Sequence, residues 1–96
     1  MIDIIATDRF AKWLDALRDV RARARIQARI RRLAEGNAGD VAAVGEGVSE
    51  MRIHYGPGYR VYFKKSGHEL LILLAGGDKS TQSADILAAL TLARHV

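Results

Sequence analysis

Basic side chains of a kind that binds phosphate gather in the second half of the chain. Arg52 and His54 precede a Gly-Pro-Gly turn at residues 56–58, Arg60 follows it, and Lys79 stands farther on. An arginine guanidinium binds two phosphate oxygens at once and stays charged, and an imidazole exchanges protons near neutral pH. These four residues predict a site for an anionic ligand, in which charge is stabilised and protons are moved.

The charge balance favours the same kind of ligand. Fifteen Lys and Arg stand against eleven Asp and Glu, a formal net charge of +4. Residues 18–35 hold seven arginines and two acids, and residues 51–65 hold no acid. Such a balance favours nucleic acid or an acidic protein as partner. The ordinary alternative, for arginines on a strand as on an amphipathic helix, is a solvated outer face.

Several classes of site are excluded or disfavoured. The chain has no cysteine, which excludes a disulfide framework, a thiol nucleophile and cysteine-ligated metals. Its histidines are scattered without metal-ligand spacing, so we expect neither a metal nor another cofactor. The longest apolar run, residues 70–75, is far shorter than the ~20 residues of a membrane span. Residues 1–7 lack the basic flank of a signal peptide, and we expect a cytoplasmic protein without membrane contact.

The first half of the chain predicts a strand followed by two helices. Residues 2–6 are short, apolar and β-branched, as in a strand. Thr7 is expected to cap a helix with the apolar stripe Phe10, Trp13, Leu14 and Leu17. Asp19 is expected to cap a second helix, which ends at Gly36-Asn37 and whose stripe is Ala22, Ile26, Ile30 and Leu33. Residues 41–44 predict a weak strand.

A hairpin is predicted from residues 49–55 and 59–64, where apolar and polar residues alternate around the turn. We expect Tyr55 to face Tyr59, which puts Ile53 against Val61 and Met51 against Phe63, all on one face. On the other face this register sets Arg60 opposite His54 and Tyr62 opposite Arg52. Lys64 then faces Glu50 as an ion pair at the rim.

Residues 69–75 predict a further strand that is covered on both faces and broken by Gly76-Gly77. Leu71 and Leu73 are expected beside the polar hairpin face, as the apolar floor of a pocket, unless the last helix packs over them. Ser80 or Thr81 is expected to begin that helix. The order β-α-α-β-β-β-β-α predicts a single α+β domain over residues 1–96, with an antiparallel-rich twisted sheet and helices on one side.

Three blocks of sequence resemble one known family. Residues 45–52 (GEGVSEMR), 56–63 (GPGYRVYF) and 76–82 (GGDKSTQ) are similar to the phage Gp49-like, HigB-type branch of the RelE/ParE toxin superfamily, the addiction module killer proteins. The resemblance extends over nearly the whole chain and includes residues 32–37 (RLAEGN). It implies a RelE/ParE-like fold and the toxin of a type II toxin–antitoxin module.

The resemblance also implies an activity. RelE- and HigB-like members are endoribonucleases that cut mRNA in the ribosomal A site without a metal, whereas ParE-like members inhibit DNA gyrase. Arg60 matches the phosphate-stabilising arginine of the nucleases, Arg52 lies where they carry basic catalytic groups, and Lys79 lies where a further acid–base residue stands. The tail Ala93-Arg94-His95-Val96 departs from the endings of some nucleases, and leaves the general base open.

The resulting hypothesis is a metal-independent, ribosome-dependent mRNA endonuclease that inhibits translation. The catalytic residues expected are Arg60, Arg52, Lys79 and His54, and the residues expected to bind RNA are Tyr62, Lys64, Lys65, Arg29 and Arg32. The expected partners are the ribosome, mRNA and a cognate helix-turn-helix antitoxin in a hetero-oligomer. Two alternatives stay open: a gyrase inhibitor or other non-catalytic toxin of the same fold, and an inactive relative or simple binding module.

Overall fold

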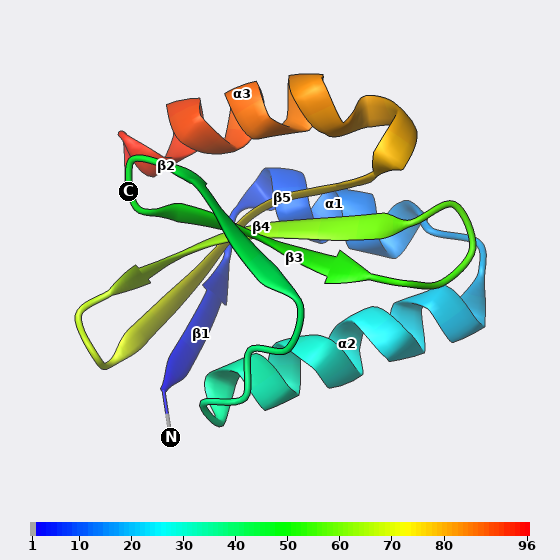
Figure 1. Ribbon diagram of the computed structural model, residues 1–96, viewed down its shortest axis with the longest axis horizontal. Coiled ribbons are helices and arrows are strands. Elements are labelled where there is room, and N and C mark those ends of the chain that lie inside the picture. The colour runs from blue at the N-terminus through cyan, green and yellow to red at the C-terminus, as the bar shows by residue number, and fades with distance from the viewer. Residues whose placement is uncertain (1) are drawn as a thin grey trace.

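A five-stranded mixed sheet forms the centre of the molecule (Figure 1). The structure, a computed structural model, describes residues 2–96. The strands lie in the order β1-β5-β4-β3-β2; β1 runs parallel to β5, and the other neighbours are antiparallel. They comprise β1 (Asp3–Ala6), β2 (Val41–Gly45), β3 (Val48–Ile53), β4 (Tyr59–Ser66) and β5 (Leu70–Asp78).

The helices follow in the predicted order and begin at the predicted caps. They are α1 (Asp8–Ala16), α2 (Val20–Ala34) and α3 (Gln82–Ala93), with a 3₁₀ helix, η1 (Lys79–Thr81), before α3. The Thr7 hydroxyl accepts from the N–H of Phe10 at 3.1 Å, and the Asp19 carboxylate accepts from the N–H of Arg21 at 3.0 Å. These bonds satisfy amide groups that the first turn of a helix leaves free. The α+β class is therefore confirmed.

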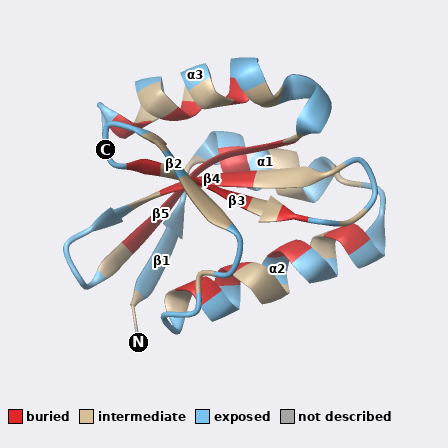
Figure 2. Ribbon diagram, in the orientation of Figure 1, coloured by how far each residue is buried: buried red, intermediate tan, exposed pale blue. Residues whose placement is uncertain are grey.

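The helices cover both faces of the sheet, so the prediction that they lie on one side is wrong. Figure 1 shows α2 and α3 on opposite sides, and Figure 2 shows the buried residues along the strands between them. One core cluster joins α1 and α2 to β3, β4 and β5, and a second joins α3 to β3, β4 and β5. Leu71 and Leu73 belong to the first cluster, so they do not floor the arginine face as predicted; α3 packs on Ile72 and Leu74 instead.

The hairpin keeps the predicted faces but not the predicted register. Arg52 pairs with Arg60, Met51 with Val61, and Ile53 with Tyr59, a shift of two residues from the expected pairing. Side chains in a strand alternate with period two, so a shift of two leaves every residue on its own face and is invisible to the sorting of apolar residues. The shift moves Glu50 from opposite Lys64 to opposite Tyr62.

Strand β5 continues through Gly76 and Gly77 to Asp78, where the sequence predicts a break. Both glycines are buried, and a Cβ on either would overlap a neighbour: the Trp13 indole beside Gly76 and the Asp85 carboxylate beside Gly77. The glycines thus let the Trp13 and Asp85 side chains approach the backbone of the strand closely, which is an alternative to the strand break that glycine otherwise indicates. Within residues 2–96, no helix combines the length and apolarity that crossing a membrane requires.

We expect Gly76→Ala to destabilise the protein by about 1–3 kcal/mol, because the new methyl group must displace the Trp13 indole in a packed region. Urea unfolding measures the change. A double-mutant cycle with Trp13→Leu is the control: the cost of Gly76→Ala should shrink in that background, and an equal cost in both would show that Trp13 is not the obstacle.

Candidate functional site

A buried carboxylate lies at the centre of the basic residues. Glu50 of β3 is 1% exposed and accepts four hydrogen bonds from side chains. Its Oε1 accepts from Nε of Arg52 at 3.1 Å and from Nη1 of Arg60 at 2.9 Å. Its Oε2 accepts from Oη of Tyr62 at 3.0 Å and from Nε2 of Gln82 at 2.8 Å. We call these five residues the Glu50 cluster.

The sheet and α3 bring the cluster together. Alternation on β3 puts Glu50 and Arg52 on one face, and the register places Tyr62 and Arg60 of β4 directly opposite them. Like charges directly opposite each other destabilise a strand pair, and here the shared carboxylate offsets that repulsion between the arginines. Gln82 comes from the first turn of α3, which crosses this face of the sheet.

The electrostatics keep Glu50 ionised. Burial opposes ionisation, but hydrogen bonds from Gln82, Arg52 and Tyr62, together with the charge of Arg60, outweigh it and lower the pKa of Glu50 below its ordinary value. Burial, followed by the bond to Glu50, raises the pKa of Tyr62. With four donors around its two oxygens, Glu50 is an anchor for the guanidinium groups and is poorly suited to accept a proton.

Arg52 and Arg60 are held close together but differ in exposure. Oε1 of Glu50 accepts a hydrogen bond from each of them, at 3.1 Å from Arg52 and 2.9 Å from Arg60, so their two donor nitrogens lie close to the same atom. The Arg52 side chain is 40% exposed and that of Arg60 is 14% exposed. The Nε of Arg60 is buried without a hydrogen-bond partner in the described part of the chain. The pair can offer guanidinium groups to one anion from adjacent strands.

His54 lies next to the cluster and pairs with an acid that the sequence did not point to. Its side chain is 77% exposed, and its Nε2 lies 2.6 Å from Oδ2 of Asp40. Asp40 also lies 3.8 Å from Nη1 of Arg52. The hydrogen bond from His54 and, after it, the charge of Arg52 lower the pKa of Asp40, against the effect of burial. The pair fixes the imidazole beside Arg52, as an orienting carboxylate does for an acid–base histidine.

Lys79 lies at the same end of the sheet but makes no hydrogen bond or ion pair with the cluster within residues 2–96. It begins η1, directly after β5, and is exposed. A Cβ on Gly58 would lie 3.6 Å from the Cβ of Lys79, which places the lysine beside the turn between β3 and β4.

Two residues predicted to bind RNA are engaged in the structure instead. Tyr62 is fully buried against α3 and bonded to Glu50, so it cannot stack on a base, and that prediction is wrong. Lys64 does not pair with Glu50 at a rim; its Nζ donates to the carbonyl oxygen of Ala93 at 3.3 Å, at the C-terminal end of α3. A cation there also faces the negative end of the helix dipole.

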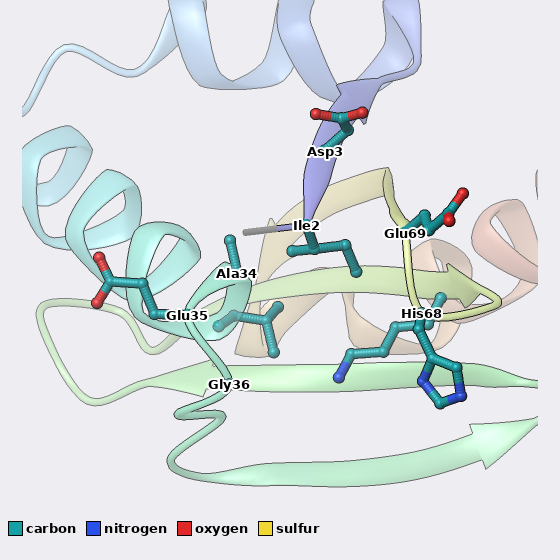
Figure 3. A pocket seen from close by; sticks show the side chains of 9 residues that line it. Ile2, Asp3, Ala34, Glu35, Gly36, His68 and Glu69 are labelled. Carbon is teal, nitrogen blue, oxygen red and sulfur yellow. The ribbon is translucent and has the colours of Figure 1, made fainter.

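Lys65 lies away from the Glu50 cluster. It follows Arg60 by five positions of β4, roughly 16 Å along the strand. It lines a cavity of about 620 Å³ between the end of α2, the start of β1 and the turn before β5. In Figure 3 the carboxylates of Asp3, Glu35 and Glu69 point in different directions, so the cavity has no convergent acidic group.

Arg29 and Arg32, the remaining pair predicted to bind RNA, lie on α2 and line a smaller cavity together with His54. The structure thus divides the predicted residues among the Glu50 cluster, its flank at His54 and the α2 cavity, and it leaves Lys64, Lys65 and Lys79 outside them. Alternation on β3 already places Glu50 on the face of Arg52. The role of Glu50 as the shared partner of Arg52 and Arg60 was not predicted, because the expected register set it opposite Lys64 and residues 51–65 hold no acid.

Comparison with known proteins shows a close relative. No family model matches the chain. A protein of Haemophilus influenzae, named "Uncharacterized protein", is 50% identical over 95 residues, which cover 99% of this chain and 96% of the relative. The similarity extends over nearly the full length of both chains, and the name states no activity.

We expect Glu50→Gln to lower the free energy of unfolding by about 3–5 kcal/mol, because it leaves the Arg60 charge buried without a counter-charge. Denaturant unfolding measures the loss. Glu46→Gln is the matched control, since it removes the same charge from an exposed pair with Arg94 and should change stability far less. Equal losses would contradict the central position of Glu50.

Stability should also fall in acid by way of Glu50. Its pKa is lowered in the folded state, so its contribution is complete above the ordinary value of 4.5 and is lost as the pH falls through the folded pKa. Urea midpoints of the wild type should therefore drop below pH ~4.5 more steeply than those of Glu50→Gln. Parallel curves would show that another carboxylate governs acid unfolding.

Proposed function

Since the chain belongs to the same family as the uncharacterized protein of Haemophilus influenzae, whose name gives no activity, we propose its function from its own residues. In this proposal the chain has a RelE/ParE-like fold and is the toxin of a type II toxin–antitoxin module. It cleaves mRNA on the ribosome without a metal and so inhibits translation.

The observation that supports cleavage is the convergence of Arg52 and Arg60 on one oxygen of Glu50. Two guanidinium groups held this close can bind the non-bridging oxygens of one phosphate, where negative charge grows in the transition state. Glu50 holds both groups in place before substrate arrives, which removes the cost of ordering two long side chains. In this arrangement Glu50 is a positioning residue.

The reaction needs two proton transfers as well as charge stabilisation. The ribose 2′-oxygen attacks the adjacent phosphorus, the bond from phosphorus to the 5′-oxygen breaks, and a 2′,3′-cyclic phosphate and a 5′-hydroxyl are formed. A base takes the 2′-proton and an acid protonates the 5′-oxygen. His54, exposed and oriented by Asp40, is suited to be the base. Arg60 and Arg52 hold the phosphate, and Lys79 supplies charge or a proton at the leaving oxygen.

The rest of the surface serves binding in this proposal. Arg29 and Arg32 on α2 and the more distant Lys65 contact the backbone of mRNA or of the ribosome. Lys64 adds charge near the end of α3, while Tyr62 has no part in binding RNA. The partner in the resting cell is a helix-turn-helix antitoxin, which covers the basic surface in a cytoplasmic hetero-oligomer.

One observation favours a second candidate, a non-catalytic toxin of the same fold that inhibits DNA gyrase. Arg60 is 14% exposed, and Arg60 and Arg52 already share a carboxylate, so the Glu50 cluster offers little exposed surface of Arg60 and is partly neutralised. Such a face suits a protein contact as well as a phosphate. Intact transcripts together with loss of gyrase supercoiling would identify this candidate.

We expect Arg60→Lys to reduce cleavage by about 10²–10³-fold, because lysine keeps the charge but loses the planar fork that binds two oxygens. Primer extension on transcripts cut by the purified protein on ribosomes measures the loss. Arg94→Lys, in an exposed ion pair, is the control and should cut at the wild-type rate. A folded Arg60→Lys protein that cuts as fast as the wild type would contradict the proposed role.

A further inference from the structure

A second cationic site lies between α2 and the end of β3. It is a cavity of about 280 Å³ lined by Arg25, Ala28, Arg29, Arg32, Ile53 and His54. The three arginines stand at positions i, i+4 and i+7 of α2, a spacing that puts them on one face of a helix. Ile53 is buried and supplies an apolar wall. The volume is just below the ~300 Å³ at which pockets for small molecules begin, and suits a compact polar group.

Arg29 is fixed in place at this cavity. Its Nη1 donates to the carbonyl oxygen of Arg52 at 2.8 Å and its Nη2 to that of Ala38 at 3.3 Å. The guanidinium fills the space where Gly39 would carry a Cβ, and the φ of +67° at Gly39 is one that glycine adopts readily. Both bonds go to neutral carbonyl groups, so the positive charge is ordered without being neutralised by them.

Arg25 is ordered by an aromatic ring. Its guanidinium carbon lies 4.6 Å from the centre of the Tyr55 ring, within the ~6 Å at which cation–π attraction acts. The Tyr55 hydroxyl donates to Asp19 at 3.1 Å, which holds the ring against the helix. The cavity is therefore walled by two arginines whose positions are set before any ligand binds.

The positive charge of the cavity has little compensation. Among the ion pairs formed by residues 2–96 within 4.0 Å, none involves Arg25, Arg29 or Arg32. Two acids lie nearby: Asp40, which is bonded to His54 at 2.6 Å and lies 3.8 Å from Arg52, and Asp19, which accepts from the hydroxyl of the Tyr55 ring beside Arg25. Both carboxylates are already bonded to other side chains, so the three guanidinium groups leave an excess of positive charge that attracts an anion.

We propose that this cavity binds a phosphate group, either of a nucleic-acid backbone or of a free phosphate compound. Guanidinium groups fixed around a pocket match the geometry of phosphate oxygens and lose little conformational freedom when a phosphate binds. Phosphate binding here stands on the geometry of the cavity, and its use for an RNA backbone rests on the proposed function. The carbonyl of Arg52 holds Arg29 while its side chain joins the Glu50 cluster, so one residue connects the two sites.

The test is a titration of the purified protein with inorganic phosphate, followed by NMR signals of the Arg29 Nε–H and the His54 ring. We expect saturable shifts at both, weakened at least about tenfold in Arg25→Gln/Arg32→Gln, which removes two charged donors. Arg18→Gln/Arg31→Gln removes the same charge from exposed residues outside the cavity and should bind as the wild type does. The absence of saturation, or equal weakening in both double variants, would overturn the site.

A single-stranded oligodeoxynucleotide distinguishes the source of the phosphate, because it lacks the 2′-hydroxyl and is not cut. Displacement of bound phosphate by the oligonucleotide assigns the cavity to a nucleic-acid backbone, and continued phosphate binding in its presence assigns it to a free phosphate compound. The Arg60→Lys protein separates the two proposals. Phosphate should shift its Arg29 signal as in the wild type although cleavage is lost, so failure of cleavage leaves the cavity standing. Loss of the Arg29 shift in this variant would place the anion at the Glu50 cluster instead.

Discussion

The burial of the Glu50 carboxylate determines how the basic residues around it are arranged. An ionised side chain that is almost fully buried must be compensated by charges and donors, and Glu50 is compensated by two arginines, a tyrosine and a glutamine from β3, β4 and α3. Each of these partners is thereby confined. That single charge accounts for three features: Arg52 and Arg60 tolerate direct pairing, Tyr62 is buried, and the first turn of α3 packs on the sheet.

Helices on both faces give the two sides of the sheet different tasks. On one side α1 and α2 pack on an apolar core of Phe10, Leu71, Leu73 and their neighbours. On the other, α3 covers Ile72, Leu74 and Ala75 but leaves the polar end of β3 and β4 to the Glu50 cluster. The cationic residues therefore lie where helical cover ends. Arg52 and His54 occupy that edge and connect the cluster to the arginines of α2.

Local features of the chain were predictable because their causes are local. Thr7 and Asp19 satisfy amides within three residues, and the apolar alternation of residues 51–63 fixes which side of each strand is buried. The register of the hairpin was not predictable, because a shift of two residues preserves that alternation. The residue opposite Glu50 was therefore also predicted wrongly. Gly76 and Gly77 were predicted to break the strand. Their actual role is to leave room for the Trp13 and Asp85 side chains, and the local sequence does not show that these side chains pack there.

The parallel pairing of β1 with β5 has a consequence for the timing of folding. Asp3 lies 67 residues before its partner Leu70, and Glu50 lies 32 residues before Gln82, the glutamine that completes the set of donors around it. Pairing so remote in sequence carries a large loop-closure entropy and is slow to form. A nascent chain therefore lacks the complete set of donors around Glu50 until Gln82 has been synthesised.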